Sequence, residues 1–198
     1  MAKRSFLGSL LELSVPESRR PAAALAAGLI AGVTSGFIKI GWENLVPPRI
    51  EGREPPPVTL LKNQGVDFES KTFTFSGNQV PWAIFSVHFG FSVAAVAAYA
   101  VLAEYLPKTK LALGTVYGTG VWAVFHLGVL PALKLSPGAK DLPRDEQISE
   151  FFGHLVWILE AEFIRRDVRQ RIAGVPDAET RSAAAAALLS TAKGALRR

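Results

Sequence analysis

Four stretches of mainly apolar residues alternate with polar segments along this chain, and their spacing predicts a bundle of membrane-spanning helices. The stretches cover residues 21–44, 81–106, 111–133 and 148–164. About 20 apolar residues are needed to cross the hydrocarbon core of a bilayer as a helix. The first three stretches meet that length, whereas charged residues shorten the fourth. The predicted fold is an all-α, polytopic membrane protein with four transmembrane helices in residues 21–172, and a re-entrant fourth segment is the alternative.

The segments outside the four stretches are short or polar. Residues 1–20 carry leucines near basic residues, so they form either an in-plane anchoring helix or a frayed segment. Residues 45–80 contain several prolines, and we expect an extended, turn-rich outer loop. Residues 107–110 form a short basic turn, so the second and third helices should be an antiparallel hairpin. Residues 173–198 form an alanine-rich tail with a helical pattern.

The placement of basic residues predicts the orientation. Fourteen of the 22 lysines and arginines fall in residues 1–20, in residues 107–110 or after residue 164. Cytoplasmic segments of membrane proteins carry an excess of these residues. Both termini are therefore expected in the cytoplasm of a multi-pass protein in the lipid bilayer.

The composition excludes several classes of function. The 198 residues are 49% hydrophobic with a net charge of +5 and no cysteine, and the mean hydropathy is +0.23. Because the basic residues flank apolar stretches, they indicate membrane orientation and not nucleic-acid binding. Disulfides and thiolate metal sites are excluded. No nucleophile with a base, phosphate loop or zinc-protease motif is present, so we expect no enzymatic activity and no catalytic residue.

Small residues recur at four-residue spacing on two of the predicted helices. They are Gly28, Gly32 and Gly36 on the first helix and Gly114 and Gly118 on the third. Such faces allow two helix backbones to approach closely in lipid. Packing within one subunit, a homo-oligomer seam and contact with another subunit of a membrane complex are the alternatives.

The polar residues inside the apolar stretches are the candidate functional site. At about 1.5 Å per residue, the three histidines of the chain lie at similar depths below the outer surface. Lys39 lies at nearly the same depth and can pair with Glu43 four residues later. Ionisable groups in hydrocarbon are costly and should face the interior of the bundle. The predicted proton-responsive residues are Lys39, Glu43, His88, His126, Glu150 and His154.

Three functions fit this group of residues. Histidine titrates near pH 6.5, so external acid could add charge beside Lys39 and change the conformation or the ion permeability. Alternatively, pairs among His88, His126 and His154 could hold haem or a transition metal. The third alternative is a non-catalytic scaffold subunit, in which neutral histidines link helices by hydrogen bonds.

A second group of charged residues lies at the predicted cytoplasmic end. Its members are Glu104, Glu162, Arg165 and Arg166. We expect interfacial ion pairs there, and a proton exit path is the alternative.

Motifs spread over residues 21–172 resemble those of the YagU family of bacterial inner-membrane proteins. The matching positions are GLIAG at 28–32, Lys39, Gly41, Glu43, PPR at 47–49, the FTF-x-G stretch at 73–77, His88, AE at 103–104, PKxKL at 107–111, His126, Pro131, DLP at 141–143, SExFGHLVW at 149–157, Glu162 and IRRDxRxR at 164–171. The loop at 50–71 is shorter than in the family and lacks its cysteines, both tails differ, and Glu160 replaces an uncharged residue. The resemblance implies an inner-membrane location and a contribution to acid resistance.

Overall fold

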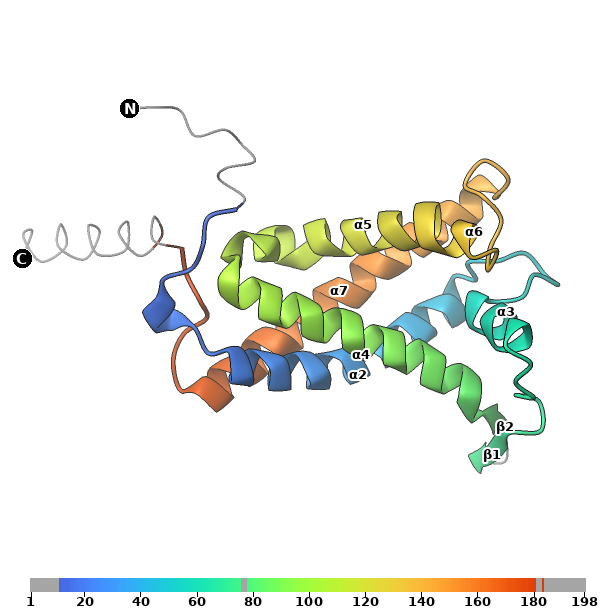
Figure 1. Cartoon of the computed structure of the whole chain (residues 1–198), viewed down its shortest axis with the longest axis horizontal. Coiled ribbons are helices and arrows are strands. Elements are labelled where there is room, and N and C mark those ends of the chain that lie inside the picture. The colour runs from blue at the N-terminus through green and yellow to red at the C-terminus, as the bar shows by residue number, and fades with distance from the viewer. Residues whose placement is uncertain (1–10, 76–77, 181–182, 184–198) are drawn as a thin grey trace, which may run out of the picture.

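The computed structural model describes residues 11–75, 78–180 and 183, and this part of the chain is mostly helical (Figure 1). Its elements in chain order are η1 (Pro16–Ser18), α2 (Pro21–Leu45), α3 (Pro56–Asn63), β1 (Thr72–Phe75), β2 (Asn78–Pro81), α4 (Trp82–Tyr105), η2 (Pro107–Gly114), α5 (Thr115–Val124), η3 (Phe125–Val129), α6 (Leu130–Ala132) and α7 (Arg144–Ala173).

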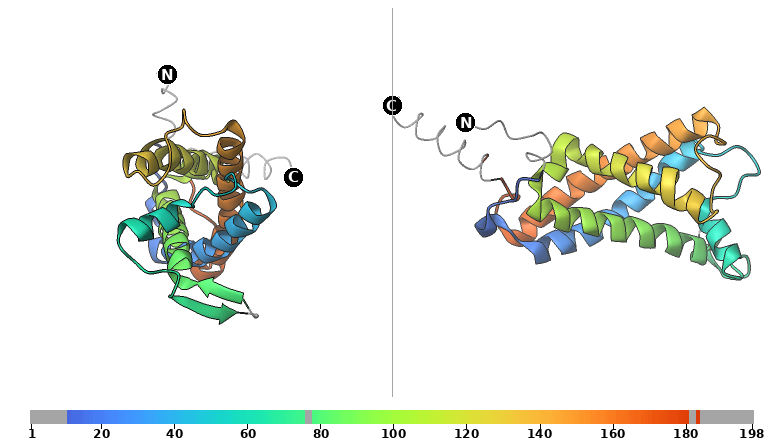
Figure 2. Two further views of the ribbon diagram at one scale, coloured as in Figure 1. Left: turned by 90° about the vertical axis from the view of Figure 1, so that its right-hand side faces the viewer. Right: turned by 45° about the horizontal axis from the view of Figure 1, so that its top comes forward.

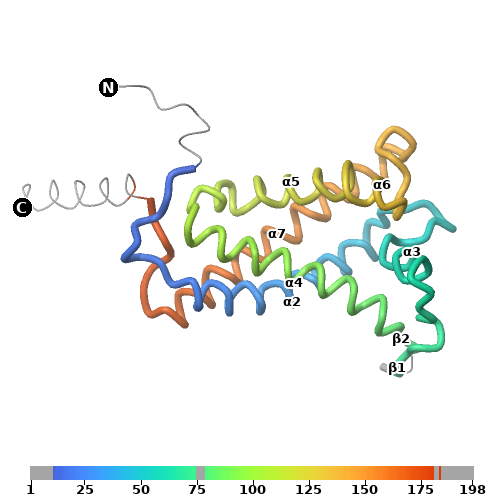
Figure 3. The backbone as a smooth tube through the Cα atoms, viewed as in Figure 1, coloured from blue at the N-terminus to red at the C-terminus, as the bar shows by residue number. Residues whose placement is uncertain are grey.

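The long helices form an elongated bundle with two different ends. Helix α2 packs against both α4 and α7, and α5 packs against α7. One end carries η1, η2 and residues 174–180, and we call it the terminal end. The other end carries α3, the β1–β2 hairpin and α6, and we call it the loop end (Figures 1 and 2). The backbone trace in Figure 3 shows the chain passing between these ends along each long helix.

Within the described part of the chain, three segments are long and apolar enough to cross a membrane. They are Pro21–Leu45, Trp82–Tyr105 and Pro107–Ala132. Helix α7 does not meet the same standard of apolar composition, although its 30 residues make it the longest helix among the described residues. The charged side chains that lower its hydropathy include Glu150, Glu162, Arg165 and Arg169, and all four are buried. Its exposed positions include Ile148, Phe152 and Phe163.

The third apolar stretch begins as a regular α-helix later than the sequence pattern predicts. Helix α5 starts at Thr115 and not at residue 111, because Ala112, Leu113 and Gly114 adopt positive φ angles of 50°, 56° and 81°. Successive left-handed residues cannot continue a right-handed helix. The short basic turn is therefore a longer, irregular connection that includes all of η2.

The loop between α2 and α4 contains more regular structure than the expected extended chain. Pro56 and Pro57 lie in the first turn of α3, where a missing N–H costs no helical hydrogen bond. Strands β1 and β2 then pair antiparallel, with Phe73 opposite Val80. The expectations for residues 1–10 and for most of the alanine-rich tail lie outside the described residues.

All five glycines of the two small-residue faces contact other helices of the same chain. A Cβ atom on Gly32 would lie 2.6 Å from the Val93 Cα, and one on Gly28 would lie 2.8 Å from the Ala97 Cα. Gly36 faces the Phe89 ring. Thus α2 and α4 approach each other closely along the first face.

The second glycine face packs against α7 and α4. A Cβ atom on Gly118 would lie 2.6 Å from the Ile158 Cγ2, and one on Gly114 would lie 2.7 Å from the Tyr99 hydroxyl oxygen. Both glycine faces are thus covered within the subunit.

Candidate functional site

A cavity of about 430 Å³ at the loop end contains all six of the candidate residues. They come from different elements: Lys39 and Glu43 from α2, His88 from α4, His126 from η3, and Glu150 and His154 from α7. Residues that are far apart in the sequence therefore line one cavity.

Four charged groups form a compact network on one wall of the cavity. Lys39 Nζ donates hydrogen bonds to Glu43 Oε1 at 2.6 Å and to Glu150 Oε2 at 3.0 Å. Arg49 Nη2 donates to the other Glu150 oxygen at 2.9 Å, and Arg49 Nη1 lies 3.7 Å from Glu43 Oε2. The two cations and two carboxylates balance each other, so the network is neutral when the histidines are neutral.

His126 and His154 lie in direct contact beside this network. Their ring centroids are 4.9 Å apart with an interplanar angle of 82°. His126 Nε2 is 3.7 Å from Glu150 Oε2. His154 Nδ1 lies 2.8 Å from the Glu150 backbone oxygen and must donate, since a carbonyl only accepts. Glu150, one helical turn before His154, thus contacts its ring through the backbone carbonyl.

His88 lines the same cavity at another position. Its Nε2 lies 3.1 Å from the Gly36 backbone oxygen on α2, so this nitrogen also donates. Its ring contacts Phe89 edge-on, with 5.5 Å between centroids. The three histidines share one cavity, but only His126 and His154 have an aromatic contact with each other among the described residues.

Local features of the sequence hold these groups in place. Gly153 leaves room for α2, because a Cβ there would lie 2.9 Å from the Trp42 Cδ1 and 3.1 Å from Lys39 Nζ. The Trp42 indole donates to the Ser149 backbone oxygen at 3.1 Å.

His126 lies in the single π-helical turn η3, just before Pro131. Leu130 N–H donates to the Phe125 carbonyl, which lies five residues earlier. Such turns widen a helix and often occur at functional sites.

Sequence reasoning missed the part of the site that comes from the loop after α2. Arg49 lies outside the apolar stretches, so its depth could not be counted along a predicted helix. Glu146 accepts a hydrogen bond from the Ile50 backbone nitrogen at 2.8 Å and lies 2.9 Å from Arg53. These contacts fix the loop against α7 and carry Arg49 to Glu150. The PPR motif at 47–49 was the available signal, since prolines restrict the path of the chain.

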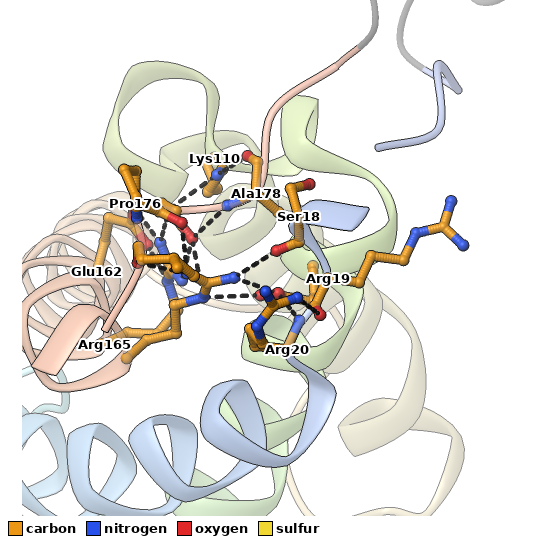
Figure 4. A network of polar contacts seen from close by, with 12 residues as sticks. Ser18, Arg19, Arg20, Lys110, Glu162, Arg165, Pro176 and Ala178 are labelled. Atoms are coloured by element: carbon orange, nitrogen blue, oxygen red, sulfur yellow. Dashed lines mark hydrogen bonds and ion pairs between the residues drawn. The ribbon is translucent and has the colours of Figure 1, made fainter. Parts of the chain in front are cut away.

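A second polar network closes the terminal end of the bundle (Figure 4). Glu104 and Arg169 are both 0% exposed and form an ion pair, with Arg169 Nε 3.2 Å from Glu104 Oε2. Arg169 also donates to the backbone oxygens of Ser18, Val175 and Pro176. One guanidinium thus joins α4, α7 and both terminal segments.

Arg165 forms the adjacent part of this network. It donates to Glu162 at 2.6 Å and to Asp177 at 2.6 Å. Lys110 donates to Asp177 at 2.8 Å. The expected ion pairs involved Glu104, Glu162, Arg165 and Arg166, and the structure corrects this set. Arg169 takes the expected place of Arg166, which is exposed, because residues 162, 165 and 169 share one face of α7.

The pKa of Asp177 predicts how this network responds to acid. Burial alone would raise the pKa of this carboxyl group, but the hydrogen bond and charge of Arg165, followed by Lys110, outweigh burial and hold its pKa well below the ordinary value of 3.8. The unfolded chain therefore binds a proton before the folded one does. The Asp177 carboxylate contributes fully to stability at a pH above its pKa in the unfolded chain. This contribution is lost as the pH falls through its pKa in the folded chain.

Asp177→Asn is expected to lower the free energy of unfolding by about 2 kcal/mol at neutral pH. Thermal unfolding of the purified protein in detergent, measured over a pH series, should show this difference shrinking only in strong acid. Asp167→Asn is the matched control, because Asp167 forms an exposed pair with Arg171. Equal effects of both substitutions at neutral pH would show that Asp177 does not stabilise the protein through this network.

Comparisons with known proteins identify the family of the chain. The family described as "Protein of unknown function (DUF1440)" matches residues 33–163. The chain is 36% identical over 197 aligned residues to the inner membrane protein YagU of Escherichia coli (strain K12), covering 86% of this chain and 96% of that protein. No solved structure matches the chain. With this similarity and its long apolar helices, the chain belongs to the YagU family of inner-membrane proteins (DUF1440).

Proposed function

We propose that this protein is a non-enzymatic inner-membrane protein that contributes to acid resistance through a proton-responsive site in the loop-end cavity. The observation that carries the proposal is the convergence of Lys39, Arg49, Glu43 and Glu150 with three histidines in one cavity. Acid would convert neutral imidazoles to cations. The response is a change of conformation or of ion permeability.

The charge balance of the cavity supports this response. Lys39 and Arg49 already neutralise Glu43 and Glu150. The closest added charge would be on His126, whose Nε2 lies 3.7 Å from Glu150 Oε2 and which could compete with Lys39 for that carboxylate. Protonating His154 as well would place two cations in rings 4.9 Å apart. Repulsion between them would favour separation of η3 from α7.

The proposed topology has four crossings, with both termini in the cytoplasm and the loop end outside. Helix α7 is the fourth crossing in this proposal. Its 30 residues give a length of about 45 Å, enough to cross about 30 Å of hydrocarbon. Its buried charges are paired inside the bundle, and apolar side chains such as Phe152 and Phe163 face outward. Acid from outside would then reach the end that carries the histidines.

A metal site is the competing assignment for the same residues. Ligand atoms of His126, Glu150 and His154 lie within 4.8 Å of one another, and three nitrogen or oxygen ligands are typical of a catalytic zinc site. Lys39 and Arg49 argue against it, because each occupies one oxygen of Glu150 and would repel a second cation. Haem is less compatible still, since the edge-to-face contact of the two rings leaves no space for a porphyrin between them.

Trp157 offers a local test of protonation. Its ring centroid is 6.0 Å from that of His154, and an imidazolium quenches indole fluorescence on contact. In a variant with Trp42, Trp82 and Trp122 replaced by phenylalanine, reconstituted in vesicles, acidification should quench the remaining fluorescence. Adding His154→Gln should remove most of the quenching.

Acid survival and proton flux test whether the response matters for function. We expect His126→Gln and His154→Gln, expressed at the level of the unchanged protein, to lower survival in acid and to alter proton flux. Unchanged survival and flux in these variants and in His88→Gln would exclude the proposed role. A metal ion bound at one per chain and lost in His126→Gln would replace it with the metal assignment.

A further inference from the structure

The loop-end cavity has the size and the walls of a binding site for a small apolar molecule. Its volume of about 430 Å³ lies within the range of about 300 to 1,000 Å³ that ligand sites occupy. Most of its remaining wall is aliphatic or aromatic, contributed by α4, by the α5–α6 segment and by α3. The aromatic members are Phe85, Phe91, Phe125 and Trp157. Flat side chains of this kind suit a flat ring.

The charges in the cavity disfavour a charged ligand. Each oxygen of Glu150 already accepts a hydrogen bond from a cation, and Lys39 also binds Glu43. A phosphate or carboxylate head group would have to displace one of these carboxylates. A cationic head group would have to displace Lys39 or Arg49. A neutral polar group can bind without displacing any of these charged side chains.

The histidines define which neutral polar group fits. His88 uses Nε2 to donate to the Gly36 carbonyl, and His154 uses Nδ1 to donate to the Glu150 carbonyl. In a neutral imidazole, the nitrogen without hydrogen is an acceptor. No other hydrogen bond in the described part of the chain engages that second nitrogen in either ring. Both rings can therefore accept a hydrogen bond from a ligand donor such as a hydroxyl group.

The remaining side-chain groups on the wall do not compete for this donor. Ser92 Oγ accepts from the Trp157 indole at 2.8 Å and donates to the Gly32 backbone oxygen at 2.7 Å. The imidazoles thus offer acceptors on the same cavity wall as the aromatic side chains.

The position of the cavity favours a molecule that arrives through the membrane. Helices α4 and α5 are joined through η2 at the terminal end and diverge toward the loop end (Figure 1). The cavity is lined from both helices in this diverging part, by Phe85 and His88 on one side and by Val129 and Leu130 on the α5–α6 side. These two sides of the cavity belong to segments Trp82–Tyr105 and Pro107–Ala132, which are apolar enough to cross a membrane.

We propose that the cavity binds a neutral aromatic amphiphile that carries hydroxyl groups, a molecule of the hydroquinone class. The ring lies among the aromatic side chains, and its hydroxyl groups donate to His88 or His154. The apolar tail extends between α4 and the α5–α6 segment into lipid. Binding at neutral pH needs no change in protonation, so it is separate from the proposed acid response.

The test uses decylubiquinol as the probe and the full chain in lipid nanodiscs at neutral pH without oxygen. We expect saturable binding beyond the partition of the probe into protein-free nanodiscs. Decylubiquinone, which has the same ring and tail but carbonyl groups in place of the two hydroxyl groups, should bind about tenfold more weakly or worse, because it has no donor for the imidazoles.

Two variants of the same helical segment provide a matched comparison. Val129→Trp fills the cavity and should weaken binding by about tenfold or more. Val124→Trp adds the same side chain at an exposed position outside the cavity and should leave binding unchanged. His154→Phe removes one acceptor and should reduce the preference for the hydroquinone over the quinone.

Three results would overturn the proposal. The first is equal partition of decylubiquinol into nanodiscs with and without the protein. The second is tighter binding of the quinone, which would contradict the acceptor role of the histidines. The third is equal loss of binding in Val124→Trp and Val129→Trp, which would place the probe outside the cavity.

Discussion

Arg169→Met is expected to lower the free energy of unfolding by about 3 to 5 kcal/mol, the largest effect of any substitution considered for this protein. Among the described residues, the substitution leaves the fully buried Glu104 carboxylate with only the Arg20 backbone nitrogen as a donor. It also removes the hydrogen bonds that hold Ser18 and Pro176 at the terminal end. Thermal unfolding of the purified protein in detergent should show a much lower midpoint.

Arg166→Met is the matched control for this prediction. Arg166 lies three residues earlier on α7 and is exposed, so its loss should change stability by no more than about 0.5 kcal/mol. Adding Glu104→Gln to Arg169→Met should restore part of the stability, because it removes the unpaired buried charge. Equal unfolding midpoints for Arg169→Met and Arg166→Met would show that the buried pair does not hold the terminal end together.

Gly32→Val is expected to lower the free energy of unfolding by about 2 to 3 kcal/mol by forcing α2 and α4 apart. The added Cβ would lie 2.6 Å from the Val93 Cα and 3.2 Å from the Ser92 backbone oxygen. Backbone atoms cannot move aside by a change of rotamer. Separation of the helices would also weaken the hydrogen bond from Ser92 to the Gly32 carbonyl.

Gly41→Val on the same helix separates packing from helix propensity. No atom lies within 4 Å of a Cβ at Gly41, and valine is a better helix former than glycine. The free energy of unfolding of the Gly41→Val variant should be unchanged or slightly higher. If both glycine substitutions destabilise the protein equally, close packing of α2 on α4 is not the cause.

Hydropathy alone located the first two long helices because length and apolar composition are local properties. The first two long helices begin and end within one residue of the ranges read from the sequence, at Pro21–Leu45 and Trp82–Tyr105. The start of α5 differs because the positive φ angles of Ala112 and Leu113 leave no mark in hydropathy. Helix α3 was missed because prolines suit both an extended loop and a first helical turn.

The grouping of the polar residues could be predicted only in part. Counting depth along each helix placed Lys39 near the histidines, and the i, i+4 spacing predicted its pair with Glu43. Depth says nothing about the rotation of a helix about its axis. For that reason, the contact of His126 with His154 and the separate position of His88 could not be foreseen.

By itself, the sequence determined the apolar segments, the glycine faces and the position of each histidine along its helix, since each depends on spacing within one helix. The tertiary structure alone decided which charged side chains form ion pairs. Arg49 reaches Glu150 from a loop, and Arg169 reaches Glu104 from another helix. Helix α7 shows the reason: charged side chains such as Glu150 and Arg169 are buried while Phe152 and Phe163 are exposed, so its mean hydropathy hides an arrangement that only tertiary packing makes stable.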